Sequence, residues 1–210
     1  MKEISMDFFR DEVRNGFFIP TAVKQAWAAQ LQVLDVIETI CRKHDITYFA
    51  DWGTILGTVR HGGYVPWDDD MDICMKREDY TRFKEAAKTE LPKDFRIHDY
   101  EHQEDHWLFL SRVANSVHIN FEPEHMKQFH NFPYIAVIDI FVLDYLYKDE
   151  QQEKQRCEEV KHIIAVADSI IAGEIAQPVK EANLIQLEEK YHKTFNRKLD
   201  NRHIGIELYR

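Results

Sequence analysis

Four aspartates within five residues stand directly before an apolar segment of the chain. Residues 67–72 read Trp-Asp-Asp-Asp-Met-Asp, and Ile-Cys-Met follows. If this stretch is extended, alternation places Asp70 and Asp72 on one face and points Met71 and Ile73 into the core. Two carboxylates on one face repel each other, so they suit a hard cation such as Mg²⁺ or Mn²⁺ better than a structural role. The run therefore predicts a metal site at the start of a buried strand.

A third acid from another strand would complete such a site, and Asp139 is the candidate. It is the single charge in the apolar stretch 134–141. A buried acid can also pair with a structural arginine or lysine, so two roles stay open for Asp139. For the aspartate run itself the alternative is a solvated acidic turn. The Pro66-Trp67 pair before the run and the strand after it disfavour that alternative.

A second element lies upstream of the aspartates, where a strand is expected to pass through Gly53 into a helix. A glycine at this point lets backbone amides approach a phosphate, and the start of a helix favours negative charge. Thr54 adds a hydroxyl donor. The sequence therefore predicts a phosphate-binding turn at Gly53 and Thr54.

The remaining pattern predicts a mixed α/β domain over residues 1–148 and a helical region over 149–210. The expected architecture is a mixed sheet flanked by helices, followed by the C-terminal helical region. Helices are expected at 21–44, with Thr21 as the cap, and at 54–59, 78–89, 149–172 and 178–197; strands are expected at 47–50, 71–75, 95–97, 107–113, 117–121 and 134–141.

Composition excludes several classes of protein. The 27 basic and 37 acidic residues give a net charge of −10, which argues against a groove for a nucleic-acid polymer and leaves room for a local phosphate pocket. The acidic first residues do not resemble a signal peptide, and the longest apolar runs are too short to cross a membrane. The three cysteines lie far apart, so we expect a reduced, cytoplasmic protein.

Two further groups of residues have open roles. His98, His102 and His106 recur at helical spacing, as a zinc site would require, but their segment is so polar that an exposed loop is favoured. Arg112 and Asn115 follow an apolar segment. They could reach a nucleotide phosphate or base, or make ordinary hydrogen bonds at a strand end.

The stretch 48–72 closely resembles the LicD family. The family pattern combines a Gly-Gly/Thr-Ser/Thr-Leu-Leu-Gly element, an Arg-His pair, a glycine, and Pro-Trp-Asp-Asp-Asp-apolar-Asp. The corresponding residues here are 53–57, Arg60 and His61, and 66–72, and the resemblance extends from about Ala22 to Asp144.

The resemblance implies a nucleotidyltransferase fold and the transfer of phosphocholine from CDP-choline to sugars of bacterial surface glycans, such as lipopolysaccharide or teichoic acid. The related fukutin-related proteins move ribitol phosphate from a CDP donor. The expected partners are CDP-choline or another CDP-alcohol and a glycan acceptor, free or lipid-linked at the membrane surface, with the protein cytoplasmic or peripheral to the inner face of the membrane. Carried over by position, the metal-binding acids are Asp68, Asp70, Asp72 and Asp139, the catalytic set is Asp70, Asp72 and Asp139, and the substrate-binding residues are Gly53, Thr54, Arg60, His61 and Arg112.

One departure from the family pattern bears on activity. The usual later Phe-Glu-Gly element and Tyr-Gly-Asp-Tyr-like segment are missing from this sequence, which predicts impaired acceptor binding. Two alternatives to the phosphocholine transferase stay open. One is a nucleotidyltransferase that releases pyrophosphate, and the other is an inactive nucleotide-binding homologue.

Overall fold

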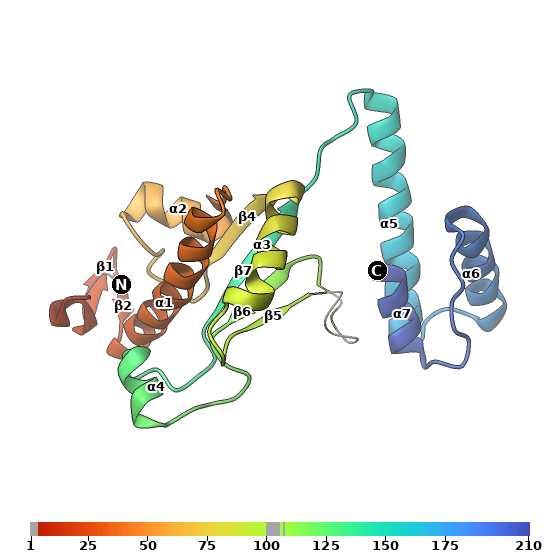
Figure 1. Cartoon of the computed structure of the whole chain (residues 1–210). Helices are drawn as coiled ribbons and strands as arrows, with labels where there is room; N and C mark the ends of the chain where they lie inside the picture. The colour runs from red at the N-terminus through yellow and green to blue at the C-terminus, as the bar shows by residue number, and fades with distance from the viewer. Residues whose placement is uncertain (1–3, 100–105, 107) are drawn as a thin grey trace. The chain divides into compact units, whose positions relative to one another are not determined.

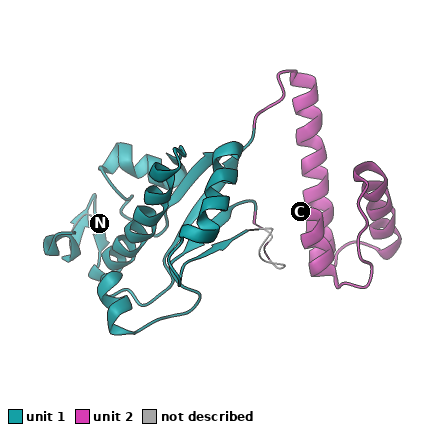
Figure 2. Cartoon of the chain, in the orientation of Figure 1, with its two compact units in different colours: residues 1–102, 109–144 teal, residues 103–108, 145–210 magenta. Residues whose placement is uncertain are grey.

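A five-stranded mixed sheet is the largest sheet in the computed structural model, which describes residues 4–99, 106 and 108–210 (Figure 1). Within these ranges the chain divides into two units: one holds residues 4–99 and 109–144, and the other holds 106, 108 and 145–210 (Figure 2). The elements of the first unit are η1 Met6–Phe9, β1 Glu12–Arg14, β2 Phe17–Ile19, α1 Thr21–Lys43, β3 Phe49–Ala50, α2 Trp52–His61, β4 Asp72–Lys76, α3 Arg77–Glu90, β5 Arg96–His98, β6 Ser111–Ala114, α4 Pro123–Gln128 and β7 Val137–Leu143.

The strand order in the large sheet is β3-β4-β7-β6-β5. β4 and β7 run parallel, and the other neighbouring pairs are antiparallel. A separate hairpin joins β1 and β2. The predicted mixed α/β fold is confirmed, although the sequence patterns did not indicate this N-terminal hairpin.

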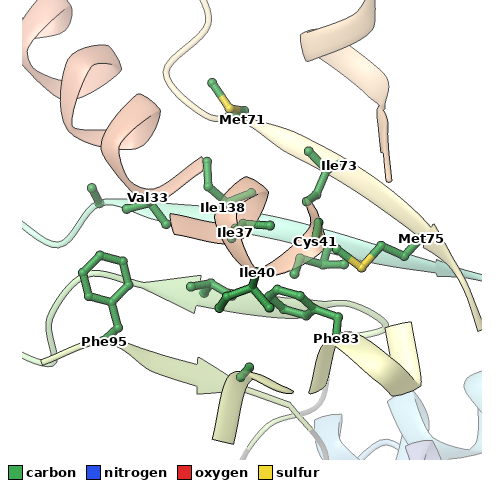
Figure 3. Packing of buried hydrophobic residues seen from close by; sticks show 14 of the residues in the cluster. Val33, Ile37, Ile40, Cys41, Met71, Ile73, Met75, Phe83, Phe95 and Ile138 are labelled. Carbon is green, nitrogen blue, oxygen red and sulfur yellow. The ribbon is translucent and has the colours of Figure 1, made fainter. Parts of the chain in front are cut away.

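The two faces of the large sheet have different chemistry. One face is the hydrophobic core, where Ile73 of β4 and Ile138 of β7 are fully buried against Ile37 of α1 and Phe83 of α3 (Figure 3). The opposite face receives the alternate residues of the same strands. The expected alternation of Asp72 with its apolar neighbours is therefore observed.

Helix α1 begins at Thr21 as expected, but Thr21 is not its cap. Pro20 occupies the cap position, and the Thr21 hydroxyl donates to the carbonyl of Phe9 at 2.7 Å. The Thr21 backbone N–H donates to the Asp11 carboxylate at 2.6 Å. Asp11, which precedes the helix, thus accepts one of the backbone N–H groups that have no partner within the first turn.

The predicted strand at 117–121 is wrong. Its apolar side chains are exposed, and the Asn120 N–H bonds to the Pro133 carbonyl in a loop. The Ser116 hydroxyl accepts the His118 N–H in a local turn, and Pro123 starts α4. Local hydrogen bonds replace a strand ladder here. The predicted strand at 107–113 shortens to β6, and its residue 107 lies outside the described part of the chain.

The second unit contains three helices: α5 Glu150–Ala172, α6 Gln177–Tyr191 and α7 Asn201–Tyr209. They bury a core of their own that includes Ile170, Leu184 and Ile204. The single helix predicted at 178–197 stops early, because His192 adopts a left-handed conformation with φ 53°. Asp200 then accepts the His203 N–H and caps α7. No helix in the described ranges is both long and apolar enough to pass through a bilayer.

Candidate active site

The aspartate run lies in a loop that buried side chains of α1 hold in place. The Trp27 indole N–H donates to the Asp68 carbonyl at 2.9 Å, and the Gln30 amide donates to the Asp69 carbonyl at 2.7 Å. Tyr64 stacks on Trp27 with ring centroids 4.7 Å apart, and its hydroxyl donates to the Gln30 side-chain oxygen. These bonds use the backbone of the loop, so its carboxylates stay available to a ligand.

Three carboxylates meet at this loop. Ligand oxygens of Asp68, Asp69 and Asp70 all lie within 4.8 Å of one another, and Asp69 and Asp70 are exposed. Burial and the neighbouring Asp68 raise the pKa of Asp70 above its ordinary value. Asp68 and Asp70 also line a cavity of about 610 Å³. Among the described residues, no lysine or arginine forms an ion pair with Asp68, Asp69 or Asp70.

Asp72 and Asp139 form a second part of the site on the parallel strands β4 and β7. They are direct partners in the strand register, so both side chains project from the same face of the sheet. Asp72 is buried, at 9% exposure. Burial, followed by the charges of Asp70 and Asp139, raises the pKa of Asp72 to about 6. The predicted proximity of Asp72 and Asp139 is thus present in the sheet.

Arg112 binds Asp139 in a bidentate pair. Its Nε and Nη2 donate to the two carboxylate oxygens at 2.6 and 2.7 Å, and the residues are register partners on β6 and β7. The pKa of Arg112 is raised chiefly by this pair. Of the two roles left open for Asp139, the ion pair with an arginine is therefore observed. Its position opposite Asp72 is compatible with the metal-binding role, which stays a prediction.

The start of α2 differs from the predicted turn. The helix begins at Trp52, before Gly53, and Asp51 caps it by accepting the Trp52 N–H at 2.9 Å. The Thr54 hydroxyl accepts the Asp72 N–H at 2.8 Å, which ties the first turn of α2 to β4. A short acidic side chain before a helix is a strong cap, and this signal at Asp51 was available in the sequence.

Position 53 requires glycine because the Asp68 side chain approaches its backbone closely, and not because of its backbone angles. A Cβ at this position would lie 2.2 Å from Oδ2 of Asp68. Gly53→Ala is therefore expected to displace the Asp68 carboxylate, which can rotate away, and to weaken Mg²⁺ binding about tenfold. The fold should be unharmed or gain up to about 1 kcal/mol, because alanine favours a helix over glycine. Calorimetric Mg²⁺ titration and urea unfolding measure the two effects.

Gly57 gives a matched control on the same helix. A Cβ there would lie 2.3 Å from the backbone carbonyl of Gly63, which cannot rotate away. Gly57→Ala is expected to destabilise the fold by about 1–3 kcal/mol, as other overpacked sites do. Equal losses of stability in the two variants would contradict the role assigned to Gly53.

Comparison with known proteins places this geometry in a family. A family model described as the LicD/FKTN/FKRP nucleotidyltransferase domain matches residues 45–165, more than half of the chain. The chain belongs to this family. The resemblance inferred from the sequence is confirmed, and the LicD-family segment includes α2, the aspartate loop, β4, β6 and β7.

Individual relatives match over a shorter stretch. The chain is 43% identical over 53 residues to the lipopolysaccharide cholinephosphotransferase LicD of Haemophilus influenzae, a stretch that covers 25% of this chain and 20% of that protein. It is 39% identical over 54 residues to an uncharacterized protein of Rickettsia typhi, covering 26% and 18%. An uncharacterized protein of Rickettsia prowazekii is 42% identical over 48 residues, covering 23% and 18%. The matches thus span about a fifth of each relative.

The Arg-His pair of the LicD pattern lies at the other end of α2, about 10 Å of helix rise from Gly53. The Arg60 guanidinium lies over the Trp67 ring at 5.8 Å, and its Nε donates to the His61 ring at 3.0 Å. His61 also contacts Asn15 of the N-terminal hairpin. These contacts favour a conformational role for Arg60 and His61 over direct phosphate binding, since they hold the loop that leads into the aspartates.

The carboxylates of this LicD-family site fit a divalent cation. Mg²⁺ and Mn²⁺ prefer hard oxygen ligands, and the Asp68–Asp70 cluster offers several within one ion's reach. Burial first, and neighbouring negative charge second, raise the pKa of Asp70 and of Asp72. A cation would relieve this repulsion.

Proposed function

We propose that this chain is a metal-dependent transferase that moves a phospho-alcohol, phosphocholine in particular, from CDP-choline to a sugar hydroxyl of a surface glycan. Membership of the LicD family supports a phosphotransferase activity. The observation that carries the proposal is the meeting of Asp68, Asp70, Asp72 and Asp139 beside the first turn of α2. The choice of phosphocholine as the transferred group and of a glycan as the acceptor is based on the name of the Haemophilus influenzae relative, a lipopolysaccharide cholinephosphotransferase.

In the proposed reaction the acceptor hydroxyl forms a bond to the choline-bearing phosphorus, and the bond from that phosphorus to the bridging oxygen breaks. CMP leaves with the electron pair of that bond. Bound Mg²⁺ or Mn²⁺, held by Asp68, Asp70 and Asp72 and shared by Asp139, would supply positive charge to the pyrophosphate and the leaving group. Asp139 orients the hydroxyl and accepts its proton. Catalysis rests on positioning and electrostatics, as in other phosphoryl transfers.

Asp139 must be partly freed to act in this way. Both of its oxygens accept bonds from Arg112 in the structure. A guanidinium released from one oxygen lies beside the carboxylate cluster, where it can donate to a donor phosphate. This arrangement supports the assignment of Arg112 to substrate binding. We assign catalysis to the domain of residues 1–148.

CDP-choline is expected to bind only with Mg²⁺ or Mn²⁺ present, because a pyrophosphate cannot approach the acidic loop without a cation between them. The measurement is calorimetric titration with CDP-choline in Mg²⁺ and in EDTA. Equal affinity in the two conditions would refute a metal bridge.

The products then separate the proposed reaction from nucleotidyl transfer. A panel of CDP-alcohols is incubated with Mg²⁺ and a glycan acceptor, and CMP and pyrophosphate are quantified. CMP release that is greatest for CDP-choline supports the proposal. Pyrophosphate release from a nucleoside triphosphate, without CMP from any CDP-alcohol, would identify a nucleotidyltransferase instead.

A further inference from the structure

Trp52 is an exposed aromatic residue in a backbone conformation that disfavours it. Its side chain is 65% exposed although it is large and apolar, and its φ is +41°. A left-handed φ is unusual for a bulky residue and costs free energy. Neither burial nor backbone preference therefore explains a tryptophan at the first position of α2. Strained residues of this kind concentrate at functional sites.

The position of Trp52 connects it to the carboxylates. The N–H of its neighbour Asp51 donates to the Asp72 carbonyl at 3.0 Å. The Trp52 ring lies 5.9 Å from the ring of Phe141, tilted by 52°. Phe141 follows Asp139 by two residues on β7, so the two share the face of the sheet that carries Asp72. Trp52 thus stands beside the acids on the face where the donor would bind.

We infer that Trp52 is the platform on which the nucleobase of the donor stacks, an assignment that rests on the proposed function. The charged groups of the site can hold the pyrophosphate, and its carboxylates can hold a quaternary ammonium. The neutral base needs a planar apolar surface, and stacking on an aromatic side chain is its usual mode of binding. The 610 Å³ cavity suits a base less well, because its Tyr64 and Trp27 rings already stack on each other.

The test uses CMP as the nucleotide and pyrophosphate as a base-free probe, each titrated calorimetrically with Mg²⁺ into the full chain. Trp52→Ala is expected to weaken CMP binding about 5- to 150-fold, the range for loss of one base–aromatic stack. Trp52→Phe should stay within about threefold of the parent. Pyrophosphate binding should be unchanged in both. Val59→Ala, at an 80% exposed apolar position on the same helix, is the matched control and should bind CMP as the parent does.

Trp52→Gly tests whether weaker CMP binding could result from unfolding and not from the lost ring. Glycine tolerates the left-handed φ, so this variant should melt no lower than the parent yet bind CMP as weakly as Trp52→Ala. Unchanged CMP affinity in Trp52→Ala would overturn the assignment of Trp52 to base stacking. A loss of pyrophosphate affinity as large as the loss of CMP affinity would overturn it as well. Both outcomes leave the proposed function standing. Phosphocholine is titrated in the same way, and a loss of affinity for phosphocholine with CMP affinity unchanged would place Trp52 at the alcohol and overturn the assignment too. A parent that binds no cytidine nucleotide would overturn both.

Discussion

Asp72→Asn is expected to abolish CMP release and to leave the metal-free protein as stable as the parent, or more stable. The Asp72 carboxylate is buried beside Asp70 and Asp139. Two such charges about 4 Å apart repel by roughly 4 kcal/mol at an effective dielectric near 20. Asparagine removes the charge and keeps the shape. If Asp72 instead anchored β4 through a cationic partner, its loss would cost about 3–5 kcal/mol.

The stability difference between Asp72→Asn and the parent should depend on pH. The pKa of Asp72 is raised from 3.8 to about 6, so the folded protein holds this proton more tightly than the unfolded chain. Ionisation of Asp72 therefore destabilises the fold. The effect is absent below about pH 4, grows between pH 4 and 6, and is complete above about pH 6. The stability gain of Asp72→Asn should follow the same course and should shrink when Mg²⁺ stabilises only the parent.

Urea unfolding in EDTA and in Mg²⁺, from pH 4 to 7.5, measures the effect. Asp144→Asn is a matched control, because Asp144 lies just past the end of the same sheet and pairs with Arg77 on the surface. Loss of that exposed pair should cost at most about 1 kcal/mol, and Mg²⁺ should not alter the cost. A lower midpoint for Asp72→Asn at pH 7 in EDTA would exclude a metal-site role for Asp72.

Arg112→Met is expected to lower CMP release about 100-fold, because Asp139 loses the group that fixes its orientation. The variant should also lose roughly 2 kcal/mol of stability in EDTA. This is less than for a fully buried pair, because the Arg112 side chain is 37% exposed. Mg²⁺ should restore part of the loss by neutralising Asp139, so the Mg²⁺-induced rise in melting temperature should be larger than in the parent.

The double variant Arg112→Met with Asp139→Asn isolates the pair. Once both charges are gone, position 139 no longer carries a carboxylate without a partner, so most of the stability should return in EDTA. The Mg²⁺ effect should fall below that of the parent. Purely additive losses in the double variant would show that the bidentate pair does not govern the stability of this site.

Local patterns predicted the parts of the site that lie within one segment. Alternation correctly predicted Asp72 between the buried Met71 and Ile73, whereas Asp70 lies in the loop before β4. The pairing of Arg112 with Asp139 depends on the register of β6 on β7, which no short pattern encodes. The sequence left the role of both residues open for that reason.

The contacts from α1 that hold the aspartate loop could not be predicted from local sequence patterns either. Gln30 is buried on α1 because it donates to the Asp69 carbonyl, a contact between residues far apart in the sequence. Gly53 was predicted to let a phosphate approach, which stays a prediction, and the structure adds that the absence of a Cβ there makes room for Asp68. The sequence indicated a close approach to the backbone at this position, and only the fold could name the partner.

The parallel pairing of β4 and β7 has a consequence for the order of folding. Parallel neighbours cannot be joined by a tight turn, and here α3, β5, β6 and α4 intervene between the two strands. Such non-local pairings close large loops and form slowly. The same step must bring Asp139 against Asp72, so charge repulsion opposes the sheet as it closes. A contact between two like charges thus forms at a late stage of assembly, where a divalent ion would act as a folding template as well as a cofactor.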